Sequence, residues 1–282
     1  MSRPHVEFIQ AQQLPWLAVK FAGDGWHGVE GKTLSVDPTT GACSMLLRLP
    51  RGFVRAAHSL EAQFEFMVLE GAQRMGDVDY GLDDYACLPA GYARDWRSEG
   101  GAILLAFFDG SPSWRGSEDL LAEWNRDQLI QRIDTHNTPW TRHDIDPTVQ
   151  FLNLSHKILR HLPATGEKTI LLSTGAQTHP KDWRERQLQH ECVEEMYLLG
   201  GDIIGERGTM YEGAYFWRPP GEWHGPFGSR RGSLSLIRFA EGHHRNIWSN
   251  RYHPFELSPA YAPQLPPELA SSKAAPWQPP RF

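Results

Sequence analysis

The amino-acid sequence predicts an all-β protein made of two copies of one barrel-forming unit, and two observations support this class. First, 26 glycines and 21 prolines occur among the 282 residues, and they bound short apolar segments such as "GAILLAFFDG". Such short runs are typical of strands joined by turns. Second, segments of the first half recur in the second half in the same order, which indicates an internal duplication.

Five pairs of segments carry this duplication, with offsets that drift only from 124 to 131 residues. The main drift lies just before residue 190, so the second copy has a longer loop there. Loops at the rim of a barrel often carry function. The pairs are "LPW" with "TPW", ending at residues 16 and 140; "GKTLSVDPTTG" (31–41) with "HKILRHLPATG" (156–166); "FEFMVLEG" (64–71) with "EEMYLLGG" (194–201); "LPAG" (88–91) with "RPPG" (218–221); and "GAILLAFF" (101–108) with "GSLSLIRF" (232–239).

The repeats divide the chain into four parts: an N-terminal barrel over 1–112, a linker over 113–139, a C-terminal barrel over 140–240 and a Pro-rich arm over 241–282. Within "SEDLLAEWNRDQLIQRI", residues 117–133, apolar side chains recur at helical spacing, which predicts a short helix in the linker. The arm has too few apolar residues to fold alone. Its aromatic side chains can dock it on a barrel as an extended segment: Trp248, Tyr252, Phe255, Tyr261 and Trp277.

Charge and cysteine content exclude several classes of protein. The net charge is -6 and the basic residues are scattered, which argues against nucleic acid as a partner. Cys43, Cys87 and Cys192 lack C-x-x-C spacing, so we expect neither a disulfide framework nor a zinc knuckle. No apolar run approaches the ~18 residues of a spanning helix, and the first residues lack a signal-peptide core. We therefore expect a cytoplasmic protein in a reducing compartment that does not bind membranes.

The repeated pattern resembles the two motifs of the cupin superfamily. These motifs run H-x-H, then a Glu about four residues later and a strand closing in Gly, followed by a P-x-G-x-x-H turn. The resemblance covers residues 16–109 and 140–240. It implies two tandem cupin barrels of the double-stranded β-helix, jelly-roll type. In finer detail the chain is similar to the ChrR-like cupins and to a related bacterial cupin family of unknown function.

In the C-terminal barrel, the resemblance places a metal-ligand set on His190, Glu194 and His224, while Leu188 stands where the family has a first His. Residues four apart on a strand face the same side, so His190 and Glu194 point inward together and Glu195 points outward. Two imidazoles and one carboxylate leave coordination positions open. A hydrogen-bonded polar cluster without metal is the alternative, but a buried carboxylate without a cation or donors costs several kcal/mol.

The N-terminal barrel has His58, Leu60, Phe64 and Arg94 at the matching positions. We expect this barrel to be metal-free, because Leu60 and Phe64 fill the volume that a metal and its ligand would need. His58 and Arg94 are then structural, although Arg94 could contact an anionic ligand. The expected role of this barrel is to pack against the second copy or to form an interface, and we expect a homodimer.

Around the proposed metal set, the strand pattern predicts a pocket for an aromatic or carboxylated small molecule. Taken singly, each pocket residue is more simply a packing residue, and Cys192 in particular is a small inward-facing apolar side chain. His243 and His244 lie outside the motif and are expected at the surface. The predicted pocket residues are Cys192, Met196, Trp223, Phe227 and Arg238.

Three functions remain open at this stage. The first is a metal-dependent enzyme acting on a small organic substrate, with a divalent ion acting as a Lewis acid or binding dioxygen and substrate side by side. Analogy with cupins favours Fe(II) and a dioxygenase over an isomerase or decarboxylase, although Mn, Ni, Co and Zn suit the same ligands. The second is a non-catalytic sensor or small-molecule binding module. The third is a structural bicupin with a vestigial polar cluster.

Overall fold

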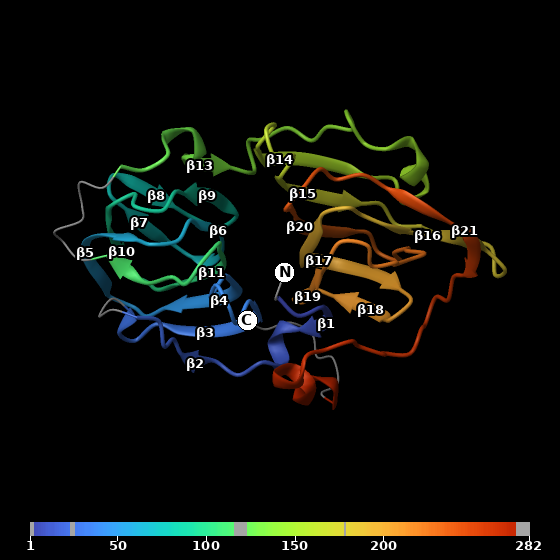
Figure 1. Ribbon diagram of the computed structural model, residues 1–282, viewed down its shortest axis with the longest axis horizontal. Coiled ribbons are helices and arrows are strands. Elements are labelled where there is room, and N and C mark those ends of the chain that lie inside the picture. Colours follow the sequence, from blue (N-terminus) through green and yellow to red (C-terminus); the bar gives the residue numbers. More distant parts are fainter. Residues whose placement is uncertain (1–2, 23–25, 116–122, 178, 275–282) are drawn as a thin grey trace. The chain divides into compact units, whose positions relative to one another are not determined.

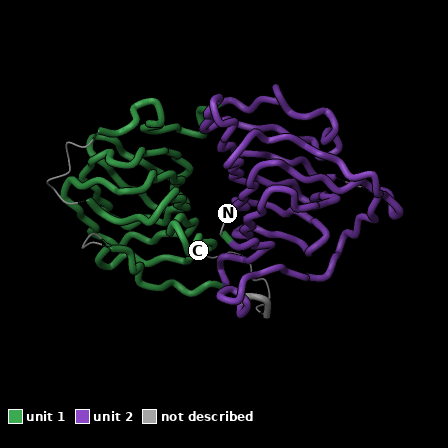
Figure 2. The backbone as a smooth tube through the Cα atoms, in the orientation of Figure 1, with its two compact units in different colours: residues 1–3, 14–138 green, residues 4–13, 139–282 purple. Residues whose placement is uncertain are grey.

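The computed structural model describes residues 3–22, 26–115, 123–177 and 179–274, and it divides the chain into two compact units (Figure 2). Unit 1 consists of residues 1–3 and 14–138, and unit 2 consists of residues 4–13 and 139–282. Each unit is built from antiparallel sheets around an interior lined by buried side chains (Figure 1). The predicted all-β class with two jelly-roll barrels is confirmed.

Unit 1 contains a seven-stranded sheet in the order β13-β9-β6-β11-β4-β3-β2 and a five-stranded sheet in the order β12-β5-β10-β7-β8. Its strands are β2 (Leu17–Ala18), β3 (Glu30–Val36), β4 (Cys43–Leu49), β5 (Phe53–Leu60), β6 (Phe64–Gly71), β7 (Gln73–Met75), β8 (Val78–Tyr80), β9 (Asp84–Leu88), β10 (Arg94–Ser98), β11 (Ala102–Phe108), β12 (Trp114–Arg115) and β13 (Ile130–Asp134).

Unit 2 contains a seven-stranded sheet in which β1-β19-β17-β20-β15-β14 follow one another and β18 pairs with β17; β16 and β21 form a second, two-stranded sheet. Its strands are β1 (Val6–Gln10), β14 (Ser155–His161), β15 (Lys168–Thr174), β16 (Arg184–Gln189), β17 (Val193–Gly205), β18 (Gly208–Tyr211), β19 (Ala214–Arg218), β20 (Ser233–Ala240) and β21 (Ile247–Pro254).

The duplication is visible in individual backbone hydrogen bonds. In unit 1 the Gly91 N–H donates to the carbonyl oxygen of Leu60 at 2.9 Å, and in unit 2 the Gly221 N–H donates to that of His190 at 2.8 Å. Both glycines have a positive φ, of 82° and 81°, a conformation that glycine adopts without the steric cost of a side chain. The turn that carries the second cupin motif is therefore built in the same way in both units.

The strand at the start of each repeat pairs with a strand of the other repeat, and not with one of its own. Strand β1 pairs with β19, where Ile9 is opposite Tyr215, and β13 pairs with β9, where Ile133 is opposite Tyr85. The two pairings are related by the offsets of the duplication. Residues 4–13 consequently belong to unit 2, whereas the sequence analysis placed them in the N-terminal barrel.

The predicted helix over 117–133 is not a helix in its described part. Residues 116–122 lie outside the described residues, a short 3-10 turn covers Arg126–Gln128, and Ile130–Asp134 forms strand β13. Pairing with β9 overrides the weak local preference of this segment for a helix. The other 3-10 turns are Ala11–Gln13, Pro147–Leu152 and Pro267–Ala274. Across the described ranges, no helix has the length and apolar character needed to cross a bilayer.

The Pro-rich segment after residue 240 runs along unit 2. Strand β21 pairs with β16, Phe255 is buried, and the Tyr261 hydroxyl donates to the carbonyl oxygen of Phe8 at 2.8 Å. Trp277, which the sequence analysis also expected to dock, lies outside the described residues. The segment thus supplies a strand of its own to unit 2.

Candidate metal centre

A cavity of about 670 Å³ lies inside unit 2. Inward side chains of seven strands, β14 to β20, contribute to its wall, and the chain that follows β20 closes one side. Most of the wall is apolar, while one end holds the three predicted ligand residues. The apolar part of the wall includes Ile170, Leu172, Met196, Ile203, Met210, Phe216, Phe227, Ile237 and Phe239.

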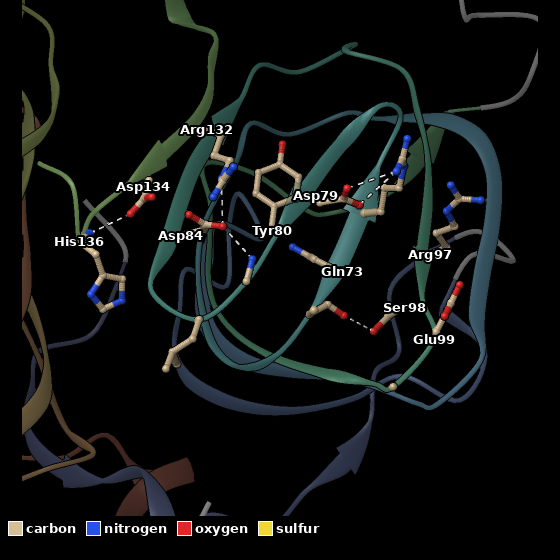
Figure 3. Close-up of a pocket in the computed structure, with 15 residues that line it drawn as sticks. Gln73, Asp79, Tyr80, Asp84, Arg97, Ser98, Glu99, Arg132, Asp134 and His136 are labelled. Atoms are coloured by element: carbon tan, nitrogen blue, oxygen red, sulfur yellow. Dashed lines mark hydrogen bonds and ion pairs between the residues drawn. The ribbon is translucent and has the colours of Figure 1, made fainter.

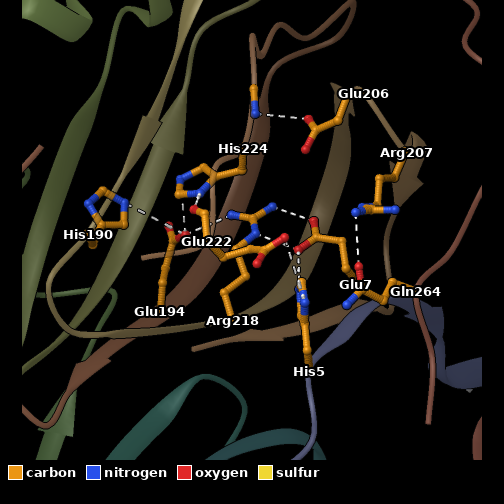
Figure 4. Close-up of polar contacts among 11 residues, drawn as sticks. His5, Glu7, His190, Glu194, Glu206, Arg207, Arg218, Glu222, His224 and Gln264 are labelled. Carbon is orange, nitrogen blue, oxygen red and sulfur yellow. Dashed lines mark hydrogen bonds and ion pairs between the residues drawn. The ribbon is translucent and has the colours of Figure 1, made fainter. Parts of the chain in front are cut away.

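The structure brings His190, Glu194 and His224 together at this cavity, as Figure 4 shows. The Glu194 Oε2 atom lies 3.8 Å from His190 Nε2 and 3.5 Å from His224 Nε2. The side chains of the two histidines are 5% and 3% exposed, and that of Glu194 is 12% exposed. Leu188 also lines the cavity and forms a two-residue bridge with His224. The position of the missing first His is therefore inside the site.

Backbone carbonyls fix the orientation of both imidazole rings. His190 Nδ1 lies 3.1 Å from the carbonyl oxygen of Arg245, and His224 Nδ1 lies 2.9 Å from that of Glu222. A carbonyl oxygen only accepts, so each Nδ1 carries a proton, and each Nε2 is the ring nitrogen that faces Glu194. Burial, with the positive charge of Arg218, lowers the pKa of His224 well below its usual value. His224 is therefore neutral at pH 7.

These three residues fit a divalent cation. Metal–ligand bonds of about 2.0–2.2 Å at tetrahedral or octahedral angles place neighbouring donor atoms about 3–3.5 Å apart, close to the separations observed here. Two imidazole lone pairs and a carboxylate oxygen are all acceptors, so a cation between them removes their mutual repulsion. Within the described ranges, this is the only group of three or more His, Cys, Asp or Glu side chains with such spacing.

A buried arginine supports Glu194 from the other side. Arg218, which is 2% exposed, donates from NH1 to Glu194 Oε2 at 2.7 Å, and its Nε donates to Glu7 Oε2 at 2.5 Å. A second contact joins Arg218 NH2 to Glu7 Oε1 (Figure 4). Burial opposes ionisation of Glu7, but the charge and hydrogen bonds of Arg218, together with those of His5, lower the pKa of Glu7. Glu7 therefore offsets the charge of Arg218, so that Arg218 does not have Glu194 as its sole counter-ion.

Sequence analysis did not assign a role to Arg218, Glu7 or His244. Arg218 could have been found from the sequence, because the duplication aligns this charged residue with an apolar residue of the first copy, Leu88. Glu7 gives no such signal, since it lies on strand β1, which is far in sequence from its pairing partner β19. His244, expected at the surface, lines the cavity with its ring centroid 4.6 Å from that of His190, whereas His243 is exposed as expected.

Three of the predicted pocket residues do not line the cavity. Arg238 lies on the outer face of β20, where its NH1 contacts Glu195 Oε2 at 2.5 Å, because Ile237 and Phe239 are the inward residues. Trp223 is 40% exposed. Cys192 is buried in the apolar core next to the cavity wall, where burial raises the pKa of its thiol to about 12.

The predicted degenerate set of unit 1 also comes together, but around very little space. His58, Leu60, Phe64 and Arg94 line a cavity of about 30 Å³, roughly the volume of one water molecule. Phe64 is 2% exposed and stacks on Phe108 with ring centroids 4.9 Å apart. The arrangement agrees with the expectation that Leu60 and Phe64 fill this interior.

Unit 1 has a larger groove of about 800 Å³ on its surface (Figure 3). Two of its arginines are paired with carboxylates: Arg74 lies 3.2 Å from Asp79 and Arg132 lies 3.0 Å from Asp84. The groove contains no ligand set of the kind found in unit 2, judged over the described residues. We therefore place the candidate site in unit 2.

Solved structures similar to this chain share its fold of two tandem jelly-roll barrels. A proposed dioxygenase from Nostoc punctiforme PCC 73102 matches with a TM-score of 0.75 and 18% identity, over 90% of this chain and 92% of that chain. Oxalate decarboxylase from Lactobacillus farciminis, in a formate complex, matches with a TM-score of 0.55 and 11% identity, over 86% and 88%. A mutant of oxalate decarboxylase from Bacillus subtilis matches with a TM-score of 0.53 and 13% identity, over 86% and 79%.

The chain belongs to the family described as "Domain of unknown function (DUF4437)", whose model matches residues 7–246. This range begins at Glu7 on β1 and ends at Asn246, beyond the last strand of the second repeat. Among curated proteins, no relative matches the sequence.

Proposed function

We propose that unit 2 binds a divalent metal ion through His190, Glu194 and His224 and that the protein is a metal-dependent enzyme acting on a small organic molecule. The observation that carries this proposal is the convergence of two imidazole Nε2 atoms on one carboxylate oxygen, with both Nδ1 atoms held by backbone carbonyls. Hydrogen bonding of this kind to the second ring nitrogen is typical of metal-binding histidines.

We propose Fe(II) as the ion and a dioxygenase as the reaction type. The similar structure from Nostoc punctiforme, itself a proposed dioxygenase, supports this choice, and two imidazoles with one carboxylate suit Fe(II) with open positions. When bound, such an ion would supply Lewis-acid and redox chemistry to a substrate in the cavity. The same ligands suit Mn, Ni, Co and Zn, and the oxalate decarboxylase structures make a decarboxylase the nearest alternative reaction.

The residues of the chain have separate roles in this proposal. Arg218 holds the Glu194 carboxylate by a hydrogen bond, and Glu7 offsets the positive charge of Arg218. The carbonyl oxygens of Arg245 and Glu222 hold the protons of the two imidazoles away from the metal side. The apolar wall, with Met196 and Phe227, excludes water from the body of a bound substrate.

Elemental analysis of protein purified without chelator tests the metal. We expect near-stoichiometric metal in the parent and in His58→Ala, which removes the matching imidazole of unit 1, and loss of metal in His190→Ala and His224→Ala. A parent protein without metal even after reconstitution would refute the proposal. Oxygen uptake with Fe(II) across diketones, catechols, hydroxy-aromatic acids and oxalate then tests the reaction. Metal binding without turnover across this panel would favour a sensor or binding protein.

Finer features predicted from the sequence remain proposals of the same kind. They are the closer resemblance to ChrR-like cupins, assembly as a homodimer and a cytoplasmic location. Size-exclusion chromatography with light scattering tests the second of these directly.

A further inference from the structure

One row of side chains crosses four neighbouring strands of unit 2 at the level of the candidate metal set. Lys168 on β15 is opposite Phe239 on β20, which is opposite Glu194 on β17, which is opposite Arg218 on β19. Directly opposed residues share a face, and all four side chains line the cavity. Neighbouring strands are about 4.8 Å apart, so the backbones of Lys168 and Glu194 are separated by roughly 10 Å.

The ammonium group of Lys168 has no carboxylate partner within ion-pair distance among the described residues. Its Nζ atom lies 5.2 Å from the centroid of the Phe239 ring. Asp144 acts on Lys168 only from a longer distance; its exposed carboxylate lies 2.7 Å from His143 instead. Burial lowers the pKa of Lys168, so the charged form gains from any anion that enters the cavity.

A second polar group of the same cavity also lacks a partner. His156 on β14 is 6% exposed, and its Nε2 atom has no hydrogen-bond partner within the described ranges. The ring already makes a hydrogen bond with the main chain of His143. Burial lowers the pKa of His156, and the positive charge of Lys168 lowers it further. An unpaired buried nitrogen costs free energy that a bound polar ligand would recover.

The other cations at the cavity are not available in the same way. Arg218 is already paired with Glu7 and Glu194. Arg245 lines the cavity but is exposed to solvent. In unit 1, the duplication places Cys43 opposite Phe108 where unit 2 has Lys168. His156 corresponds to Gly31 by the same offset. The lysine and the histidine therefore occur only in the unit that has the open cavity and the candidate ligands.

We propose that Lys168 and His156 form a carboxylate-binding subsite, and that the substrate is a small monocarboxylic acid with an apolar, ring-sized body. The carboxylate would accept from Lys168 Nζ. It would also accept from His156 Nε2 when the ring takes up one proton from solvent on binding, because the ring in its neutral form offers only a lone pair there. The body lies against Phe239 and Ile237, and the far end faces His190, Glu194 and His224. The inference rests on the proposed function, because it assumes that the substrate occupies the same cavity.

Calorimetric titration with benzoate and with its neutral isostere benzamide tests the subsite. We expect the parent to bind benzoate at least tenfold more tightly than benzamide, because hydrogen bonds to a charged group contribute about 1.5–3 kcal/mol. Lys168→Met should abolish this preference, and Lys168→Arg should retain most of it, since both keep a long side chain. His156→Leu should weaken benzoate binding to a smaller extent. Thermal unfolding of each variant checks that the fold is intact.

The design separates this inference from the proposed metal function. Each titration is made with metal-free and with metal-loaded protein, and metal content is measured in every variant; Lys168→Met should keep the metal content of the parent. A parent that prefers benzoate through Lys168 but holds no metal would refute the metal proposal alone. Benzoate binding that is absent from the parent, or that survives Lys168→Met unchanged, would overturn the subsite even if metal binds.

Discussion

In the larger sheets of the two units, six strands pair in the same order, β13-β9-β6-β11-β4-β3 in unit 1 and β1-β19-β17-β20-β15-β14 in unit 2. The interiors differ greatly in size, about 30 Å³ in unit 1 and about 670 Å³ in unit 2. The difference lies mainly in the row of inward side chains that crosses four neighbouring strands and in the two motif positions that His190 and His224 occupy in unit 2. In unit 1 the row reads Cys43, Phe108, Phe64 and Leu88, and in unit 2 it reads Lys168, Phe239, Glu194 and Arg218. The register is unchanged, so a few inward side chains decide whether the barrel is packed or open.

The outer faces of the two sheets, by contrast, have kept the same contacts. The Tyr85 hydroxyl donates to Glu65 at 2.7 Å, and the Tyr215 hydroxyl donates to Glu195 at 2.5 Å, with both pairs buried. Since a shift of one residue would turn every side chain to the other face, these outer pairs help to fix the register. The inner face was consequently free to change without loss of the fold.

The largest expected effect comes from giving unit 2 the side chains of unit 1. The double substitution His190→Leu and Glu194→Phe should abolish metal binding, because it removes two of three ligands and places an aromatic ring beside Phe239, as Phe64 lies beside Phe108. Metal content and thermal unfolding measure the result, and the exposed Glu191→Gln is the control. A double variant that holds as much metal as the parent would show that the ion binds elsewhere.

A comparison of two matched phenylalanines tests the packing difference. Phe108→Ala should cost about 3–5 kcal/mol of unfolding free energy, because Phe108 is 3% exposed and stacked on Phe64 in a filled interior. Phe239→Ala, at the corresponding position of unit 2, should cost clearly less, because one side of this ring borders the open cavity instead of packed side chains. Urea unfolding of both variants measures the two losses, and equal losses would contradict the difference in packing.

The third prediction concerns the strand that unit 2 receives from the start of the chain. Glu7→Gln should lower metal affinity by about 10–100-fold, the usual range for residues that support metal ligands. Without the Glu7 carboxylate, Arg218 neutralises Glu194 instead and withdraws it from the cation.

Metal titration at constant pH measures this affinity, and Glu256→Gln, an exposed substitution in the same unit, is the control. Unchanged affinity in Glu7→Gln would show that the N-terminal strand has no role in the site. Because Glu7→Gln keeps the shape of the side chain, a loss of affinity with normal thermal unfolding reports the charge rather than the packing.

How far the site follows from sequence depends on where each residue lies along the chain. His190, Glu194 and His224 lie within one repeat, where motif spacing and strand parity place them together. The strand pattern failed for Arg238, which was predicted to line the pocket, whereas Ile237 and Phe239 face the cavity. In a buried strand both faces are largely apolar, so composition alone does not tell them apart.

Partners from outside the repeat could not be derived in this way. Glu7 meets Arg218 across 211 positions of sequence, and His244 reaches the cavity from the segment after β20. Such contacts depend on tertiary pairing, of which a single sequence gives no periodic signal. The helix expected over 117–133 failed for the same reason, because Ile130–Asp134 satisfies its backbone by pairing with β9.

The smallest expected effect concerns the turn beside His224. Trp223→Ala gives this turn the residue found at the matching position of unit 1, Ala93. Because Trp223 is 40% exposed and does not line the cavity, the change in unfolding free energy should stay within about 0.5 kcal/mol, and metal affinity should be unchanged. Urea unfolding and metal titration provide both values. A tenfold loss of metal affinity would instead mean that the turn, and not only the inward side chains, distinguishes the two barrels.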